Sequence, residues 1–236
     1  MSQSKKLVIV ESPAKAKTIG KYLGDDYEVL ASVGHIRDLP VPSSLPADMK
    51  KGPFGKYAVD INDKFTPFYV VSDDSKKTVS ELKKALKGAD ELYLATDEDR
   101  EGEASSWHLL QVLNPKVPVH RMVFHEITKE AIQEAQKNTR ELDTHLVDAQ
   151  ETRRILDRLY GWDLSDVTRR RVGAGTSAGR VQTVTVRLIV DRERERMAFT
   201  SANYWDLVAT LGTSAEEGTR FEAKLARLAG TSIASG

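Results

Sequence analysis

Short apolar runs alternate with amphipathic segments over the first half of this 236-residue chain. Residues 7–10 are continuously apolar, which is typical of a strand buried on both faces of a parallel sheet. Glu11 closes that run. Ser12 and Pro13 then supply an N-cap and a first helical residue for a helix over 14–22, which Gly24 ends. The pattern therefore predicts a buried strand that passes directly into a helix.

The same alternation continues to residue 137. We expect strands over 27–33, 91–96 and 117–124, and helices over 75–86, 102–113 and 128–137. Four prolines between Pro40 and Pro53 predict an irregular loop after the second strand. Strands that alternate with helices indicate an α/β fold around a parallel sheet, in which ligands bind at the carboxyl ends of the strands. Glu11 and Asp97 both stand at such ends, so we expect them to share a site.

A different pattern begins near Asp143. A helix is predicted over 146–160, with a polar side that carries Gln150, Arg154 and Arg158. Its expected core stripe comprises Ala149, Leu156 and Leu159. A further helix over 177–196 is strongly apolar from 181 to 190, and strands are expected over 204–211 and 221–225. We therefore expect an α/β domain over 1–142, a helical segment over 143–200 and the first strands of a β-rich domain over 201–236.

Composition places the chain among soluble globular proteins, with 40% apolar and 30% charged residues. No apolar run approaches the roughly 20 residues that span a bilayer, and the N-terminus is not a secretory signal. The sequence has no cysteines, which excludes disulfides, thiolate zinc sites and cysteine nucleophiles. We expect a cytoplasmic protein that does not enter a membrane.

Charge is distributed unevenly, although the formal net charge is zero. Between Arg153 and Arg187 there are eight arginines, no lysines and three acids, which gives this segment a net charge of +5. Arginine forms planar, bidentate contacts with phosphate that lysine does not form. Such a segment indicates a nucleic-acid surface, although arginine-rich helices are also ordinary solvated faces.

Three acids alternate directly after the third predicted strand: Asp97, Asp99 and Glu101. In extended backbone, alternate side chains point to the same side, so the three carboxylates can converge on one point. Their hard oxygen ligands suit Mg²⁺ and leave room for water and phosphate. The competing interpretation is that these acids sit in the first turn of the next helix and complement its dipole.

Other segments leave a functional and a structural interpretation open. The glycine-rich stretch 173–180 lacks the ending of a P-loop, but it can bind an anion before a helix N-terminus or be a plain turn. Lys15, four residues after Glu11, is either part of the site or solvated, and His35 either contacts phosphate or caps a turn. His108 lies on an apolar helix face and is expected to be buried rather than catalytic.

Four segments stand out together: residues 7–16 (LVIVESPAKA), 32–40 (SVGHIRDLP), 96–103 (TDEDREGE) and 177–182 (SAGRVQ). In this order they resemble the bacterial type IA DNA topoisomerases. The resemblance implies a Toprim domain over 1–142, a helical segment that grips single-stranded DNA, and the start of an arch domain. It also implies an ATP-independent isomerase that relaxes negatively supercoiled DNA. In this family a tyrosine cleaves one strand, another strand passes, and the break is resealed.

The resemblance assigns roles to individual residues. Glu11 would handle protons at the leaving and returning sugar oxygen, and Lys15 would hold the scissile phosphate. Asp97, Asp99 and Glu101 would bind Mg²⁺, which positions the cleaved ends. The DNA strand would be contacted by His35, Arg153, Arg154, Asp157, Arg158, Trp162, Arg180 and Gln182. Many relatives carry tyrosine in place of Trp162.

The resemblance also implies a nucleophilic tyrosine, and with it the partners that this chain would need. None of the seven tyrosines has the closely following arginine and threonine of the family's nucleophile. We therefore expect an amino-terminal piece that needs the remainder of the polypeptide and does not relax DNA alone. We expect a monomer that binds a single-stranded segment of duplex DNA. Two other functions stay open: a different Toprim enzyme, such as a primase or nuclease, which residues 177–182 disfavour, and a DNA-binding module without catalysis.

Overall fold

Four parallel strands form a sheet in the order β2-β1-β7-β8. They are β1 (Lys6–Val10), β2 (Tyr27–Ala31), β7 (Glu91–Leu94) and β8 (Val119–Arg121). The chain is seen here in a computed structural model that describes residues 5–203, 205–213 and 218–232. All four predicted strands are confirmed, although the last three are shorter than the apolar runs suggested.

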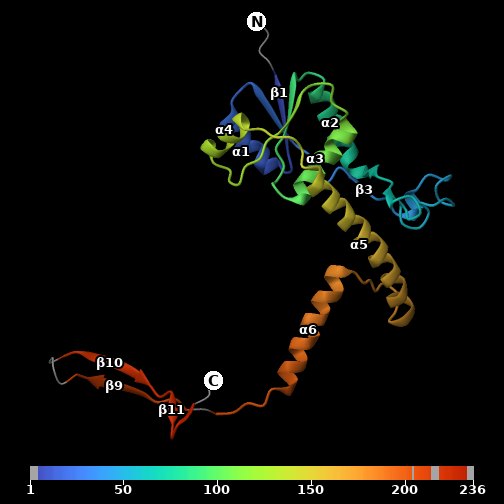
Figure 1. Cartoon of the computed structure of the whole chain (residues 1–236). Helices are drawn as coiled ribbons and strands as arrows, with labels where there is room; N and C mark the ends of the chain where they lie inside the picture. Colours follow the sequence, from blue (N-terminus) through green and yellow to red (C-terminus); the bar gives the residue numbers. More distant parts are fainter. Residues whose placement is uncertain (1–4, 204, 214–217, 233–236) are drawn as a thin grey trace. The chain divides into compact units, whose positions relative to one another are not determined.

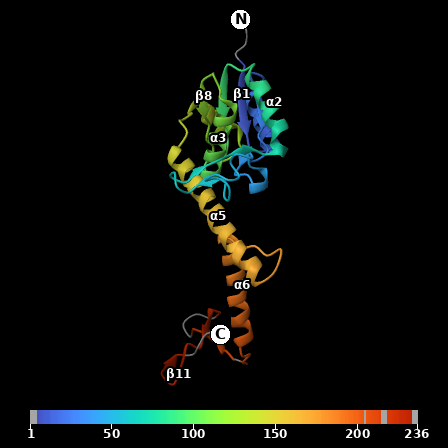
Figure 2. The ribbon, with the colours of Figure 1, turned by 90° about the vertical axis from the view of Figure 1, so that its right-hand side faces the viewer.

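Helices cover both faces of the sheet (Figures 1 and 2). Leu7 and Ile9 of β1 pack in the core on the side of α2 and α3, while Val8 and Val10 pack on the side of α1 and α4. This division follows from the strand itself, because its successive side chains point to opposite faces. The helices are α1 (Pro13–Leu23), α2 (Lys76–Leu86), α3 (Arg100–Leu113) and α4 (Lys129–Lys137).

Local capping fixes where the strands pass into helices. The Ser12 hydroxyl accepts a hydrogen bond from the Lys15 N–H at 3.3 Å, and Pro13 is the first residue of α1, as predicted. Thr128 caps α4 in the same way at Ala131. Because β1 ends at Val10 and Ser12 caps α1, the residue between them, Glu11, is held at the edge of the sheet.

The proline-rich stretch after β2 is mostly irregular, as predicted, but it contains short antiparallel pairs. β3 (Arg37–Asp38) pairs with β6 (Val70–Val71), and β4 (Val59–Asp60) pairs with β5 (Thr66–Pro67). Single turns of 3₁₀ helix occur at η1 (Pro42–Ser44) and at η2 (Asp73–Ser75), which leads into α2. A small core centred on Leu39, Leu45 and Val59 packs against Ile155.

The helix α5 (Thr144–Arg171) is longer than predicted and faces the other way. The expected core stripe is wrong: Ala149 is exposed and Leu156 is 50% exposed, whereas Gln150 and Arg158 are 7% and 6% exposed. The polar side of α5 is buried because the surface that it meets is itself polar. Carboxylates and backbone carbonyl oxygens of the α/β domain accept its hydrogen bonds.

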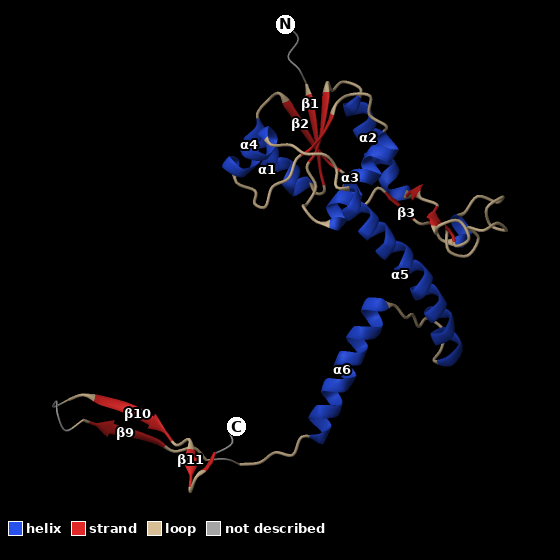
Figure 3. Ribbon diagram, in the orientation of Figure 1, coloured by secondary structure: helices blue, strands red, loops and turns tan. Residues whose placement is uncertain are grey.

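The chain divides into two compact units, Met1–Thr183 and Val184–Gly236, and the division falls inside α6 (Arg180–Ala198). The second unit contains two antiparallel pairs, drawn in red in Figure 3. The first of the strands expected there begins at Tyr204, which lies outside the described residues. Domain boundaries at 142/143 and 200/201 stay a prediction. The strands are β9 (Val208–Gly212), β10 (Arg220–Lys224), β11 (Arg227–Leu228) and β12 (Thr231–Ser232).

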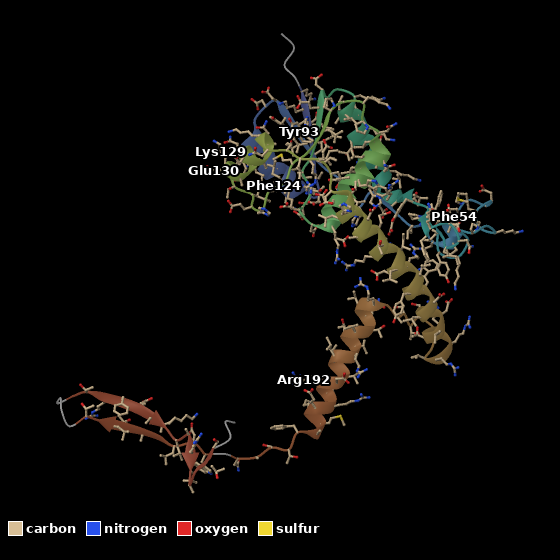
Figure 4. The ribbon with its side chains drawn as sticks, in the orientation of Figure 1. Phe54, Tyr93, Phe124, Lys129, Glu130 and Arg192 are labelled. Atoms are coloured by element: carbon tan, nitrogen blue, oxygen red, sulfur yellow. The ribbon has the colours of Figure 1, made fainter. Side chains whose placement is uncertain are left out.

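Side chains on the two units differ in their surroundings. Tyr93 of β7, labelled in Figure 4, is 5% exposed and stacks on His120, with ring centroids 4.9 Å apart. Arg192 of α6, also labelled, pairs with Glu195 at 2.7 Å on the exposed part of that helix. Leu188 of the same helix is 67% exposed. Within the described part of the chain, no helix combines the length and the apolarity needed to cross a membrane.

A buried ion pair ties the sheet to the loop after β7. Glu103 in the first turn of α3 is fully buried, and Arg121 at the end of β8 is 2% exposed. Arg121 Nε donates to Glu103 Oε1 at 2.9 Å. The other nitrogens of this guanidinium donate to the carbonyl oxygens of Thr96 at 2.8 Å and Asp97 at 2.7 Å. Arg140 also donates to Glu103. One guanidinium therefore fixes the backbone that carries the acidic residues.

Arg121→Met should destabilise the protein by about 3–5 kcal/mol, because it leaves a buried carboxylate without its main partner. Arg121→Lys keeps the charge but not the forked contacts, so it should lower the stability by less than Arg121→Met does. Urea unfolding measures both. Arg169→Met, at an exposed arginine of α5, is the control and should change stability by about 0.5 kcal/mol or less. If Arg121→Met costs no more than this control, Arg140 alone satisfies Glu103.

Candidate nucleic-acid and metal site

The two strand ends that were predicted to share a site do so. β1 and β7 are neighbours, and the chain leaves them in opposite directions, from β1 toward β2 and from β7 toward β8. Such a switch point opens a crevice at the carboxyl ends of the strands. Glu11 directly follows β1, and Asp97 follows β7 by three residues. Figure 2 shows the strands running toward the end of the domain from which α5 extends.

Lys15 lies between these two carboxylates. Its Nζ donates to Glu11 Oε2 at 2.7 Å and also to the carboxylate of Asp97. The other oxygen of Glu11 accepts a hydrogen bond from the backbone N–H of Asp97. Burial works to lower the pKa of Lys15, but its hydrogen bonds to Asp97 and Glu11 outweigh burial and raise the pKa above its ordinary value. An amine therefore lies between carboxylates that follow two neighbouring strands, and its part in a reaction stays a prediction.

The three alternating acids do not converge. The strand stops before Asp97, and α3 begins directly after Asp99, so Glu101 lies in helical backbone and not in the extended backbone that was assumed for all three acids. Asp99 caps α3 by accepting from the Gly102 N–H at 2.8 Å, and Glu101 lies in the first helical turn. Within 5–203, 205–213 and 218–232, no group of three His, Asp or Glu side chains is placed to hold a metal ion. Asp99 and Glu101 therefore lie at the start of a helix, as the competing interpretation held.

The backbone around Asp97 leaves no room for adjustment. A Cβ added to Gly102 would lie 2.1 Å from the Asp97 carbonyl oxygen, so only glycine fits there. The Gly102 carbonyl in turn accepts from the Thr96 hydroxyl at 2.7 Å, and the same hydroxyl is 2.7 Å from Ser106 Oγ. These contacts fold the loop tightly over the start of α3. They explain why serine at position 106 is buried beside an otherwise apolar helix face.

A left-handed turn brings His35 to the same place. Val33 has a φ of 57°, which is strained for a β-branched residue, and the following glycine N–H donates to the Glu11 carbonyl at 3.2 Å. His35 Nδ1 then lies 3.2 Å from Ser105 Oγ. Its Nε2 lies 3.9 Å from Glu101 Oε2. His35 is therefore tied to α3 and to one of the three acids.

A pocket of about 340 Å³ is formed by α3, α5 and the segments that flank the proline-rich loop. Five of the predicted site residues line it: His35, Glu101, Arg153, Arg154 and Asp157. The other lining residues are Arg37, Asp38, Tyr69, His108 and Gln150, which sequence analysis did not assign to the site. Two of them, Arg37 and Asp38, lie inside the motif 32–40. Their place in that motif could have identified them as site residues.

A second pocket, of about 270 Å³, lies farther along α5. Asp157, Trp162, Arg180 and Gln182 line it together with residues 177–179 of the glycine-rich stretch. Asp157 also lines the first pocket, so the two adjoin. Arg180 Nε donates to Asp157 Oδ1 at 2.9 Å, and this hydrogen bond lowers the pKa of the carboxyl. The glycine-rich turn thus forms one wall of a pocket.

Arg158 differs from the other arginines that were assigned to the site because it is buried. It donates to the carbonyl oxygens of Pro40, at 2.8 Å, and Leu39. Its guanidinium carbon lies 4.6 Å from the centroid of the Trp162 ring. Arg158 therefore holds the proline-rich loop and the Trp162 ring in place, and its donors do not face solvent. By contrast, Arg154 lies at the surface and forms a bidentate pair with Asp38.

His108 forms the floor of the first pocket and is buried, as predicted. Arg37 Nε donates to His108 Nδ1 at 2.6 Å, which leaves the imidazole proton on Nε2, 3.7 Å from Glu151 Oε1. Burial, followed by the charge of Arg37, lowers the pKa of His108 to about 3. Tyr69 donates to Glu151 at 2.8 Å and also lies beside the Arg37 guanidinium. The imidazole is therefore a neutral acceptor.

Comparison with known proteins accounts for this arrangement. The Toprim domain model matches residues 6–127, and the DNA topoisomerase model matches residues 141–232. The chain belongs to the bacterial type IA DNA topoisomerases. DNA topoisomerase 1 of Synechococcus elongatus is 58% identical over 232 residues, and that of Mycolicibacterium smegmatis is 55% identical over 237 residues. Each alignment covers 98% of this chain and about a quarter of the relative.

A solved structure shows the same fold. Full-length topoisomerase I from Thermotoga maritima superposes with a TM-score of 0.68 at 44% identity, and the match covers 86% of this chain and 32% of that one. The resemblance drawn from the four motifs is confirmed. The first pocket combines residues of both matched models, since His35 and Glu101 belong to the Toprim match and Arg153 to the topoisomerase match.

His108 should stay neutral at pH 5, because its pKa in the folded protein is about 3 against an ordinary 6.5. The unfolded chain takes up this proton first as pH falls. The stability that His108 contributes is therefore complete above pH 6.5 and is lost progressively between 6.5 and about 3. Imidazole ¹⁵N NMR, with assignment by comparison with His108→Gln, measures the protonation. Titration of the His108 signal near pH 6.5 would contradict the expected effect of burial.

Proposed function

We propose that this chain supplies the phosphate-handling and strand-holding part of a type IA topoisomerase that relaxes negatively supercoiled DNA without ATP. One observation carries the proposal: Lys15 lies between Glu11 and Asp97 at a strand switch point, and two adjoining pockets along α5 carry arginines. The chain spans about a quarter of its curated relatives, so the complete reaction belongs to the longer proteins. We further propose a monomer that works in the cytoplasm.

The chemistry assigned to the switch point is phosphodiester exchange. A tyrosine outside this sequence attacks the phosphorus, the bond from phosphorus to the 3′ oxygen breaks, and a proton reaches that oxygen. In this proposal Glu11 passes this proton and takes it back on resealing. Lys15 binds the phosphate oxygens and stabilises the charge that develops on them. Its raised pKa keeps the ammonium charged while it does so.

The single strand follows the pockets along α5. Arg153, Arg154 and Arg180 bind its phosphates, and His35 orders the strand near the cleaved bond. Trp162 stacks on a base, a contact that tolerates any sequence. Arg158 acts through that ring and through the proline-rich loop, because its own donors are bound to backbone. Gln182 and Asp157 complete the second pocket.

Mg²⁺ is assigned to Asp97, Asp99 and Glu101. Their donors are hard carboxylate oxygens, which fit this ion in chemical type. Their arrangement does not fit as it stands, because each carboxylate has a different protein partner. When bound, the ion would neutralise charge on the cleaved ends. The strand-holding role of the arginines does not depend on it.

Single-stranded oligonucleotide should bind the purified chain with an affinity that falls as salt rises. Arg180→Gln should weaken binding about five- to tenfold and reduce the slope of log K against log salt by about 0.7, because one phosphate contact is lost. Fluorescence anisotropy over a salt series measures both. Lys21→Gln, an equal charge change at the far end of α1, is the control and should leave the slope unchanged.

Three outcomes would count against this function. Binding that does not change with salt would remove the arginine pockets from the DNA surface. Relaxation of supercoiled DNA by the purified chain would show that it contains its own nucleophile, which we expect it to lack. Metal-dependent nicks with free 5′-phosphates would favour a nuclease instead.

Mg²⁺ binding should depend on the acidic pair at the start of α3. Asp97→Asn/Asp99→Asn removes two carboxylates while asparagine keeps the cap of α3, so folding should be preserved. Calorimetric titration with MgCl₂ should lose most of its heat in this variant. Asp73→Asn/Asp74→Asn, a matched pair in η2, should titrate like the parent. Identical titrations of the two variants would remove the metal assignment.

A further inference from the structure

The helix α2 turns a row of lysines toward solvent. Its apolar side packs into the core of the α/β domain, so the opposite side is exposed. On that side Lys76, Lys83 and Lys87 are seven and four residues apart, which places them on one stripe of the helix, and Lys84 lies beside Lys83. At 1.5 Å per residue the stripe is about 16 Å long. These four residues are called the lysine face below.

Most of the lysine face has no anionic partner. Lys76 pairs with Asp73 at 2.6 Å. In the part of the chain that the structure describes, no carboxylate forms an ion pair with Lys83, Lys84 or Lys87, and all three are exposed. Three neighbouring cations without acids repel one another, and an anionic partner would relieve that repulsion.

This charge pattern is not that of an ordinary solvated helix. The exposed side of α4 carries Lys129 and Glu130, which are labelled in Figure 4, and a second pair of opposite charges follows them. Mixed signs of this kind are typical of a helix that faces only water. The dipole of α2 favours lysine in its last turn, but not at Lys76 in its first turn. The length of the stripe therefore needs another explanation.

Pockets connect the lysine face to the proposed strand path. A pocket of about 480 Å³ follows the lysine face, and Lys76 lines both this pocket and a neighbouring one of about 360 Å³. Asp38 lines the neighbouring pocket and also the first pocket of the candidate site. The two acids of the middle pocket are already neutralised, since Asp38 pairs with Arg154 and Asp73 with Lys76. The three pockets thus adjoin in series.

We propose that the lysine face binds the phosphates of the double-stranded DNA that flanks the single strand. The inference rests on the proposed function and deepens it. A duplex that is opened locally has double-stranded DNA on either side of the opened strand. At about 3.4 Å per base pair, a stripe of about 16 Å runs beside about five base pairs. One arm of the duplex therefore meets several lysines at once.

The two basic surfaces differ in the cation that they use. Residues 153–187 have eight arginines and no lysines, whereas residues 76–87 have five lysines and no arginines. Arginine holds phosphate in a fixed, forked geometry, which suits a strand that must be positioned for cleavage. Lysine is a point charge on a flexible stem and contacts phosphate without a fixed geometry. A lysine surface therefore suits duplex DNA that is held without regard to its sequence.

The experiment is fluorescence anisotropy of the purified chain over a KCl series. The probes are a labelled oligodeoxythymidine and the same strand with a hairpin arm of about ten base pairs, one helical turn, at its 5′ or its 3′ end. The chain should bind one arm-bearing probe about tenfold more tightly than the plain strand, because the arm adds phosphate contacts. The end that carries the effective arm gives the direction of the strand along the pockets.

Lys83→Gln/Lys84→Gln/Lys87→Gln should remove most of the gain from the arm. The slope of log K against log salt for the arm-bearing probe should fall by about 2–3, since each phosphate contact contributes about 0.9. Affinity for the plain strand should not change. Lys83→Arg/Lys84→Arg/Lys87→Arg keeps the charge and should keep the gain. Lysine, glutamine and arginine have similar helix propensities, and thermal unfolding identifies any variant that fails to fold.

A matched control separates the lysine face from the total charge. Lys17→Gln/Lys21→Gln/Lys129→Gln removes the same three charges from α1 and α4, which cover the other face of the sheet. This variant should keep both the gain from the arm and the slope of the parent.

The outcomes distinguish this inference from the function on which it rests. If the plain strand binds but neither arm adds affinity, the inference is overturned and strand binding stands. The inference is also overturned if the α2 variant binds the arm-bearing probe like the control variant, or if it loses affinity for the plain strand to the same extent. If the plain strand does not bind at all, the proposed function fails, and the inference fails with it.

Discussion

The arrangement of the site depends on one buried carboxylate, Glu103, and the groups that surround it. Arg121 reaches it from β8, Arg140 from the segment after α4, and the N–H of Asp143 from the start of α5 at 3.1 Å. Burying a charged group is costly unless all of its hydrogen bonds are made, so these elements have little freedom to separate. Because Asp143 caps α5, the same carboxylate that fixes the acidic loop also fixes where α5 begins.

The interface between α5 and the α/β domain is polar, and this has a functional consequence. Across it, Arg154 is paired with Asp38 and Arg153 with Glu101, and beyond it Arg180 of α6 is paired with Asp157 of α5. Each carboxylate occupies a position that a phosphate oxygen could take. If a DNA strand binds here, as we propose, it exchanges one anion for another on existing cations, which limits the net gain from each contact.

Sequence reasoning succeeded where local rules decide the structure and failed where tertiary partners do. The run 7–10, the Ser12 cap and the meeting of Glu11 with Asp97 follow from strand burial, capping and parallel topology, all of which are readable in one sequence. The stripe on α5 was assigned to the wrong side because periodicity shows which face is apolar, but not whether the surface opposite is apolar too. Arg121 gave no signal, since a lone arginine at a strand end is ordinary until Glu103 is placed beside it.

Backbone and side chains play different parts in this site. Several contacts fix the backbone at once. Gly102 tolerates no Cβ, and Arg121 binds successive carbonyl oxygens of the loop. The strained Val33 is held because the N–H of the next residue donates to the Glu11 carbonyl. The charged side chains, by contrast, are bound to partners that ions or phosphate can replace. A rigid frame that carries exchangeable ion pairs can change its charge distribution without changing its fold. The contact between Arg153 and Glu101 joins the proposed strand path to the acids at the start of α3.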